Sequence, residues 1–146
     1  MRTKIGLLAA CCMLSLVAAL PAVATTTVTV RLEDPSTGPA VHRMELLASP
    51  SHVPAGVTIF HVENLSKDLV HETLVIRPPA SGRLPYDAKD KRLIESRVDK
   101  VGDSGDLKPG TATTMKVALK PGKYLLICNE PGHYKGGMHA WLTVNR

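Results

Sequence analysis

The residues best suited to chemistry lie close together near the carboxyl end of the chain. A thiol, an imidazole and a thioether follow one another at even spacing as Cys128, His133 and Met138, the pattern C-x4-H-x4-M, with prolines and glycines bending the segment between them. A thiolate combined with imidazole and a weak thioether is the ligand set that favours copper and one-electron redox chemistry. The pattern therefore predicts a copper site. Zinc is the other ion that these ligands would accept.

The cysteine count supports metal binding. Cys11 and Cys12 lie in an amino-terminal segment that we expect to be removed, which leaves Cys128 as the single cysteine. One cysteine cannot form an internal disulfide, so its thiol is free, paired between chains or bound to metal. A buried cysteine that only packs is the common alternative. The neighbouring His133 and Met138 favour a metal ligand instead.

The amino terminus has the pattern of a secretory signal peptide. Basic residues precede an apolar run over 5–20, and the segment ends in a small-x-small cleavage pattern. We expect removal of residues 1–24, export to the periplasm, a single domain over 25–146 and no membrane span after cleavage. The alternatives are a retained anchor, for which the run is short, and lipid attachment at Cys11, for which the preceding apolar stretch is short. An extracellular location is also less favoured than the periplasm.

The charge pattern excludes one class of partner. The chain of 146 residues has 18 Lys and Arg against 13 Asp and Glu, a net charge of +5, and the basic residues are scattered. A nucleic-acid face needs a dense basic cluster, so we expect no nucleic-acid partner. Mild attraction to an acidic partner is all that this charge implies.

Short segments rich in β-branched residues recur along 25–146, separated by turn residues, and no long helical periodicity is present. About seven to eight short strands predict an all-β fold, an antiparallel sandwich or barrel. The segment 78–110 is charged and poor in β formers, and within it acidic residues precede apolar ones at helical spacing. That predicts a short helix over Asp87–Lys100, or else a long loop. The expected strands cover 25–32, 41–48, 56–64, 72–77, 111–119, 122–128 and 138–144.

Strand periodicity assigns directions to the candidate ligands. Met138 has the same parity as two apolar residues that follow it, so we expect it to point inward, whereas His139 should point outward and is not a ligand. The loop after Cys128 should return His133 to the same pole of the sandwich. A trigonal site needs one more imidazole, from another strand. Of the other histidines (His42, His52, His61, His71 and His139), His71 is favoured because it opens a strand after a polar turn.

These features resemble the cupredoxins, the blue copper family with azurin-like, plastocyanin-like and sulfocyanin-like members. The segment 124–144 resembles their Cys-x-x-Pro-Gly-His…Met ligand loop. The segment 62–76, VENLSKDLVHETLVI, is similar to the part in which a strand ends at Asn and the first copper histidine opens the next strand. The resemblance covers nearly all of 25–146, with 78–110 matching only loosely.

The resemblance implies a Greek-key β-sandwich or barrel that binds one type 1 copper ion. It makes His71, Cys128 and His133 the trigonal ligands and Met138 the axial one. Two departures leave the redox potential open: Glu72 follows His71 where many members have Asn, and the cysteine is followed by Asn rather than by Ser or Thr.

The implied function is electron transport rather than catalysis. We expect an exported carrier of single electrons between redox partners of the cytochrome or oxidase type, with the exposed edge of His133 as the exit and Tyr134 beside it. The alternative is a copper-handling protein, for delivery, storage or tolerance, whose partners are other copper-handling proteins. An enzyme with a Cys–His nucleophile would need a group that orients His133, and none is evident. His42 and Met44 share a strand face and form a weak candidate for a second copper contact.

Overall fold

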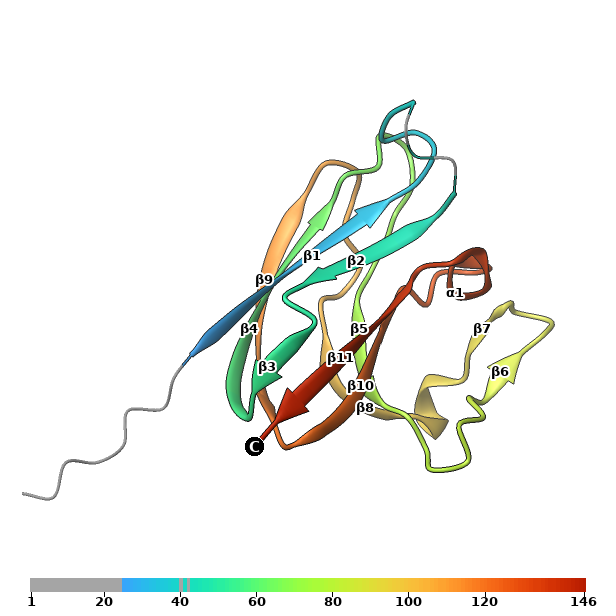
Figure 1. Cartoon of the computed structure of the whole chain (residues 1–146). Coiled ribbons are helices and arrows are strands. Elements are labelled where there is room, and N and C mark those ends of the chain that lie inside the picture. Colours follow the sequence, from blue (N-terminus) through green and yellow to red (C-terminus); the bar gives the residue numbers. More distant parts are fainter. Residues whose placement is uncertain (1–24, 40, 42) are drawn as a thin grey trace, which may run out of the picture.

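The structure is a computed structural model that describes residues 25–39, 41 and 43–146. The predicted signal peptide, residues 1–24, and His42 lie outside the described residues. Two β-sheets pack face to face around the core (Figure 1). The first sheet has the order β2-β1-β4-β9, and its strands are β1 (Thr26–Glu33), β2 (Glu45–Ser49), β4 (Gly56–Asn64) and β9 (Ala112–Leu119).

The second sheet has the order β3-β11-β10-β5-β8. Its strands are β3 (His52–Pro54), β5 (Leu74–Arg77), β8 (Asp99–Asp103), β10 (Gly122–Ile127) and β11 (His139–Asn145). A separate two-stranded hairpin joins β6 (Tyr86–Asp87) to β7 (Arg92–Leu93). The described helices are the 3₁₀ turn η1 (Glu95–Arg97) and the single turn α1 (His133–Gly136).

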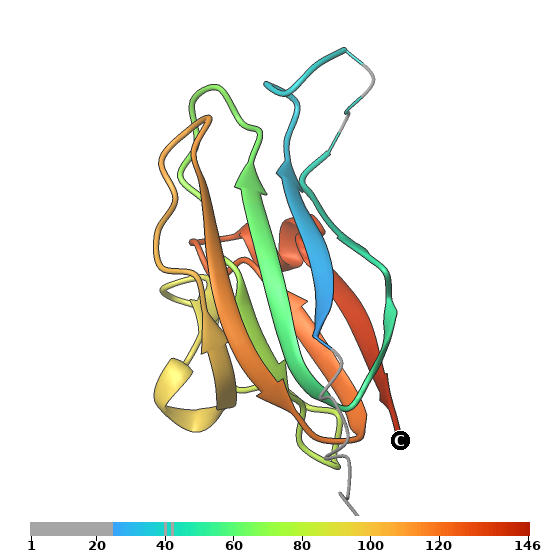
Figure 2. The same cartoon turned by 90° about the vertical axis from the view of Figure 1, so that its left-hand side faces the viewer.

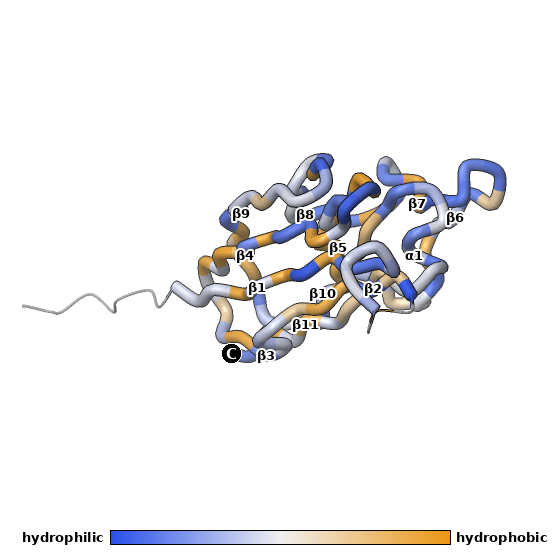
Figure 3. Tube along the Cα trace, turned by 90° about the horizontal axis from the view of Figure 1, so that it is seen from above, coloured by the Kyte–Doolittle hydropathy of each residue, from blue (hydrophilic) through white to orange (hydrophobic). Residues whose placement is uncertain are grey.

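Alternating side chains build the core between the two sheets. In β4, Phe60 and Val62 are fully buried, whereas His61 and Glu63 face outward and lie within 3.2 Å of each other. A fully buried side chain of this kind stabilises the fold by about 1.5–3 kcal/mol relative to an exposed one. Figure 3 shows apolar positions alternating with polar ones along β1, the period-2 pattern of a strand with one buried face, whereas β5 and β10 carry consecutive apolar residues.

The predicted all-β sandwich is confirmed, but its strands are not all antiparallel. β1 pairs with β4 in parallel, and β3 pairs with β11 in parallel, while the other described pairs are antiparallel. The reason is that the chain changes sheets twice between β2 and β4, so that β3 joins the second sheet before the chain returns. Alternation in a sequence predicts which face a residue occupies, and it leaves the partner strand undetermined.

The predicted helix over Asp87–Lys100 is wrong. The segment instead forms the β6–β7 hairpin, η1 and the start of β8. Asp87 Oδ1 accepts the N–H groups of Lys89 (2.8 Å) and Asp90 (3.3 Å), which closes a turn in place of a first helical turn. Lys91 then has a positive φ of 55°, which breaks any helical continuation.

The connections that follow β1 and β4 lie at the end of the sandwich opposite the carboxyl terminus (Figures 1 and 2). Cys128 immediately follows β10, and α1 lies between β10 and β11. The fold therefore brings segments distant in sequence to one pole. In the part of the chain that the structure describes, no helix has the length and apolarity needed to span a membrane.

Candidate metal centre

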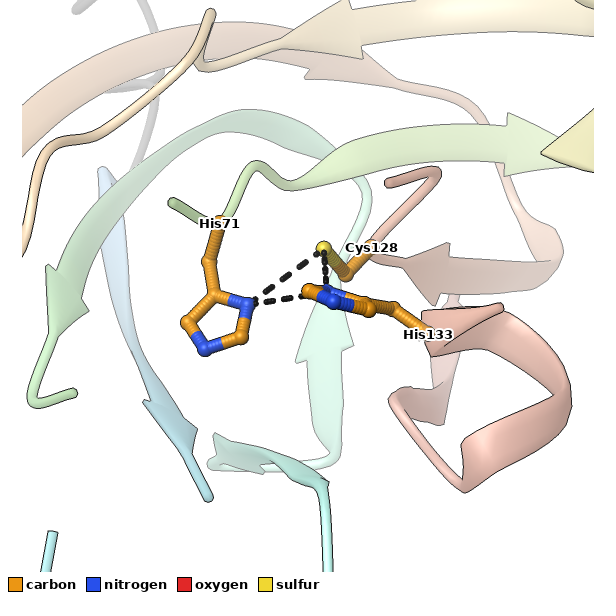
Figure 4. Close-up of side chains that lie close together, drawn as sticks. All are labelled: His71, Cys128 and His133. Carbon is orange, nitrogen blue, oxygen red and sulfur yellow. Dashed lines mark hydrogen bonds between the residues drawn. The ribbon is translucent and has the colours of Figure 1, made fainter. Parts of the chain in front are cut away.

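Three candidate ligands from separate parts of the chain meet at this pole. The Nδ1 atoms of His71 and His133 are 3.1 Å apart, and the Cys128 Sγ lies 3.8 Å from the first and 3.4 Å from the second (Figure 4). His71 and Cys128 are fully buried, and His133 is half-buried. The three side chains point toward one another from the loop after β4, the end of β10 and the helical turn α1. The sequence placed His71 at the opening of a strand and His133 on a loop, whereas β5 begins only at Leu74 and His133 begins α1.

The spacing of the three atoms suits a metal ion. A point about 2.0 Å from each of them lies inside the triangle that they form. Imidazole nitrogen and thiolate sulfur bind a first-row ion at about 2.0–2.3 Å. Two imidazoles and one thiolate around one point are the trigonal set of blue copper sites. The residues present therefore fit a type 1 copper ion.

The connection from β4 to β5, which carries His71, is held by its own side chains. Asn64 donates through Nδ2 to the carbonyls of Leu69 and Leu107, both at 2.9 Å, and its Oδ1 accepts the N–H of Ser66 at 3.0 Å. His71 forms an isolated antiparallel bridge with Leu107, with N–H···O distances of 3.2 and 2.7 Å. Its backbone is therefore fixed on both sides before any metal binds.

The far nitrogen of the His71 ring contacts a carboxylate. His71 Nε2 lies 3.0 Å from Asp34 Oδ2, and both side chains are buried. Burial alone would raise the pKa of Asp34, but hydrogen bonds from Ser36, Ser66 and His71 outweigh it and lower that pKa to about 2. Asp34 is therefore ionised at neutral pH.

Cys128 is held by its neighbours on both adjoining segments. Its N–H donates to the Met138 carbonyl at 3.1 Å, and its sulfur accepts the backbone N–H of Glu72 at 3.4 Å. Burial raises the pKa of the thiol to about 12, which keeps it protonated until a cation arrives to stabilise the thiolate. Because the bond from residue 72 comes from the backbone, the unusual Glu does not remove it. Burial, and then the charge of Glu95, raise the pKa of Glu72 itself to about 7.

The turn that carries His133 depends on two glycines. Gly132 (φ 88°) and Gly137 (φ 117°) bracket α1 in conformations that side chains rarely adopt, and a Cβ on Gly137 would lie 2.7 Å from the Met44 carbonyl. His133 accepts the Met138 N–H at 3.0 Å through its carbonyl. Burial, and then the proximity of the His71 ring, lower the pKa of His133 to about 4, so the His133 ring is neutral at neutral pH and able to bind a metal.

The predicted directions of Met138, which precedes β11, and of His139, which begins it, are confirmed. Met138 is fully buried and joined through its backbone to both Cys128 and His133, whereas His139 is exposed. The His139 ring lies 5.4 Å from that of Tyr134, which is half-buried and also faces Tyr86 at 6.5 Å. Tyr134 is therefore part of a packed aromatic group. The role of Met138 as axial ligand stays a prediction.

The suggested second copper contact stays untested. His42 lies outside the described residues, and Met44 packs against α1, where its sulfur would be 3.3 Å from a Cβ on Gly136. Met44 supports the ligand turn through this packing.

Solved structures with the same architecture are found among blue copper proteins. Reduced auracyanin of Roseiflexus castenholzii superimposes with a TM-score of 0.60 at 19% identity, over 86% of this chain and 100% of that one. Auracyanin A, a "blue" copper protein of Chloroflexus aurantiacus, gives a TM-score of 0.58 at 18% identity over 84% and 100%. Rusticyanin of Thiobacillus ferrooxidans gives 0.64 at 17% identity over 83% and 77%. The chain has the cupredoxin fold. No family model matches the sequence, and no curated protein matches it at a significant level.

Two side-chain contacts around the candidate metal site were not predicted from the sequence. Asp34 was not among the predicted site residues, and its contact with His71 joins residues far apart in the chain. Asn129, noted only as a departure, is fully buried and binds Leu93 of the hairpin. An acidic residue directly after a strand was the available signal for the first, and the unusual residue after the cysteine was the signal for the second.

Proposed function

We propose that the protein binds one type 1 copper ion and carries single electrons between redox partners. His71, Cys128 and His133 would be the trigonal ligands, with Met138 as the weak axial ligand. The observation that carries the proposal is the ring of two Nδ1 atoms and one Sγ around a metal-sized gap. Bound there, copper would supply a one-electron couple between its two oxidation states. The fold shared with auracyanin and rusticyanin supports the assignment.

The ligands are organised for electron transfer because they are positioned in advance. The backbones of His71 and Cys128 are fixed by hydrogen bonds inside a packed framework, so little has to move when an electron arrives or leaves. His133 is the half-buried ligand of the three, and its edge would be the route for the electron. A partner that docks here would be a cytochrome or an oxidase.

The same residues suit an enzyme poorly. A thiol whose pKa is raised to about 12 by burial is a weak nucleophile, since the thiolate is the reactive form. The carboxylate that orients an imidazole here contacts His71 and not the His133 that follows the cysteine in the chain. We therefore propose no catalytic role.

Adding copper(II) to the purified protein tests the site. We expect an intense blue or green thiolate-to-copper band that is absent in Cys128→Ser and unchanged in His139→Gln, whose exposed ring is adjacent in sequence to Met138. A Met138→Leu variant should keep the band and change the reduction potential. Absence of the band in the unmodified protein, with correct folding, would refute the copper assignment.

The carrier and the copper-handling alternative differ in what the reduced protein does next. A carrier is reoxidised rapidly by a cytochrome or oxidase in a stopped-flow experiment and keeps its copper. A delivery protein instead loses copper(I) to an acceptor protein faster than it gives up electrons. Slow electron transfer to every redox partner tried, together with fast metal loss, would favour copper handling.

We also propose that the protein is exported to the periplasm. The proposal depends on the basic and apolar amino terminus and its small-x-small end. Expression of the full chain in a bacterium, followed by fractionation and amino-terminal sequencing, should give periplasmic protein that begins at Thr25. A membrane-bound product with an intact amino terminus, or one modified at Cys11, would contradict this.

A further inference from the structure

A buried carboxylate, that of Asp34, contacts the His71 ring on its far side and is not one of the proposed copper ligands. Asp34 lies just after β1, and its Oδ2 is 3.0 Å from His71 Nε2, on the side of the ring that faces away from Cys128 and His133. The exposed fractions are 0% for His71 and 1% for Asp34. Burying a charged group costs free energy unless the group is paired and hydrogen-bonded. The buried Asp34 carboxylate therefore needs its hydrogen bond to His71, whereas water can replace the partner of an exposed carboxylate.

Asp34 is itself oriented by its neighbours. Its Oδ1 accepts the backbone N–H of Ser36 at 2.7 Å and also the Ser36 hydroxyl. That hydroxyl lies 3.1 Å from the Ser66 hydroxyl and accepts the N–H of Lys67 at 2.9 Å. One carboxylate oxygen is therefore committed to the turn, and the other is left for His71. The same bonds tie the connection after β1 to the connection that carries His71.

We propose that Asp34 positions His71 for metal binding by fixing which ring nitrogen holds the proton. An ionised carboxylate can only accept hydrogen bonds, so Nε2 must be the protonated nitrogen when it faces Oδ2. Nδ1 then keeps its lone pair and directs it toward Cys128 and His133. The inference rests on the proposed copper site, and it assigns to Asp34 the role of a buried partner that orients a metal ligand.

The geometry makes an unusual prediction for Asp34→Asn. Two donors from Ser36 converge on Oδ1, so the amide oxygen of the variant is held at that position. The amide NH₂ then takes the place of Oδ2 and faces His71 Nε2. Two donors cannot face each other, so the ring changes tautomer and Nδ1 becomes protonated. Asp34→Asn should therefore impair copper binding at least as much as Asp34→Ala, although it is closer in shape.

The variants are compared by copper(II) and copper(I) affinity, with Glu33→Gln as the matched control. Glu33 precedes Asp34, is also nearly buried, and pairs with Arg31 at 2.8 Å instead of with a ligand. We expect copper(II) affinity to fall about 10- to 100-fold in Asp34→Asn and to stay within about twofold in Glu33→Gln. The lost negative charge weakens copper(II) more than copper(I). The reduction potential depends on the ratio of the copper(I) affinity to the copper(II) affinity. It should therefore rise by about 59 mV for each tenfold increase in that ratio.

A measurement on the unmodified protein keeps the inference testable if the variants do not fold. In the metal-free protein, nitrogen-15 NMR of the histidine side chains should show the His71 ring protonated at Nε2 and unprotonated at Nδ1. A ring protonated at Nδ1 in the unmodified protein would overturn the proposal.

The outcomes separate this inference from the copper assignment. If the unmodified protein shows no thiolate-to-copper band, the copper assignment fails, whatever the tautomer. If the band is present but Asp34→Asn folds with unchanged affinity and potential, only the role of Asp34 is refuted. A loss of folding stability alone, with copper affinity and tautomer unchanged, would make Asp34 a purely structural residue.

Discussion

Asn129 fastens the β6–β7 hairpin to the cysteine end of the site, and its removal should release the hairpin. Its Oδ1 accepts the Leu93 N–H at 2.7 Å, and its Nδ2 donates to the Leu93 carbonyl at 3.1 Å and to Glu95 Oε1 at 3.2 Å. The side chain therefore pairs with Leu93 as a neighbouring strand would. Asn129 and Leu93 are 0% and 1% exposed.

The magnitude for Asn129→Ala follows from the groups left without partners. Both backbone groups of Leu93 lose their hydrogen bond, and an unsatisfied buried group costs about 1–3 kcal/mol. Water can reach the rim near Glu95, so we expect the lower part of the summed range, about 2–4 kcal/mol. Because 1.4 kcal/mol corresponds to a tenfold change in an equilibrium constant, the equilibrium constant for opening the hairpin should rise by about 30- to 700-fold.

Hydrogen exchange and limited trypsin digestion measure that opening. The reporter amides are Ile94, which donates to Pro85 at 2.8 Å, and Gly132, which donates to Lys91 at 2.7 Å. Trypsin should cut the variant quickly after the basic residues of the hairpin. The matched control is Asn145→Ala, an exposed asparagine on β11 whose loss should cost less than about 0.5 kcal/mol.

The thiolate-to-copper band distinguishes release of the hairpin from collapse of the site. We expect it to persist in Asn129→Ala, because the hydrogen bonds of Cys128 to Met138 and Glu72 do not involve the asparagine side chain. Unchanged exchange at both reporter amides would refute the reasoning, since it would mean that the hairpin is held by its apolar contacts alone.

Three further predictions concern stability. Gly137→Ala should lower the free energy of unfolding by about 1–3 kcal/mol in denaturant titrations, because φ is 117° and the new Cβ would lie 2.7 Å from a backbone carbonyl oxygen. The control Gly38→Ala, whose new Cβ meets no atom within 4 Å, should change that free energy little. Equal effects of the two substitutions would contradict the argument. Tyr124→Phe should cost about 1–3 kcal/mol by the same assay without moving the copper band, because the buried hydroxyl makes three hydrogen bonds away from the site, and a neutral result would disprove it. Lys100→Met should cost at most about 1 kcal/mol at neutral pH. Burial alone would raise the pKa of Asp103, but the hydrogen bond from Lys100 outweighs burial and lowers that pKa. The stability that the contact contributes is therefore present above the ordinary carboxyl pKa and should vanish in unfolding curves toward pH 3. A cost of Lys100→Met that grows in acid would refute this reasoning.

The sequence predicted most of the sandwich because strand periodicity is a local signal. The strand predicted over 56–64 has the same bounds as β4, and the outward direction of His139 is confirmed. The short strand β3 and the parallel pairs were missed, because pairing depends on where the chain changes sheets. The helix over Asp87–Lys100 was wrong because the turn at Asp87 and the pairing of Leu93 with Asn129 outweigh a helical spacing of apolar residues.

The candidate ligands could be predicted from the sequence, whereas the residue that contacts the His71 ring could not. Cys128 and His133 were identifiable because one short segment carries both, and His71 because it lies just before a predicted strand, in a segment similar to a known family; in the structure that strand, β5, begins at Leu74. Asp34 was not identifiable, because its contact with His71 depends on the packing of two connections against each other. Residues that bind a metal leave a pattern in sequence, whereas the residues that orient them lie wherever the fold brings them.

The contacts around the three candidate ligands differ in strength, and that difference bears on function. His71 is held by Asp34 and by its backbone bridge, and Cys128 by backbone bonds on both sides. The ring of His133 is half-buried on a single helical turn between two glycines. If copper leaves the site, His133 is therefore the ligand that has to move. Gly132→Ala, which meets no atom within 4 Å but restricts a φ of 88°, should alter copper(I) release while leaving the potential nearly unchanged. Copper(I) release that is the same in Gly132→Ala as in the unmodified protein would refute this role of the turn that carries His133.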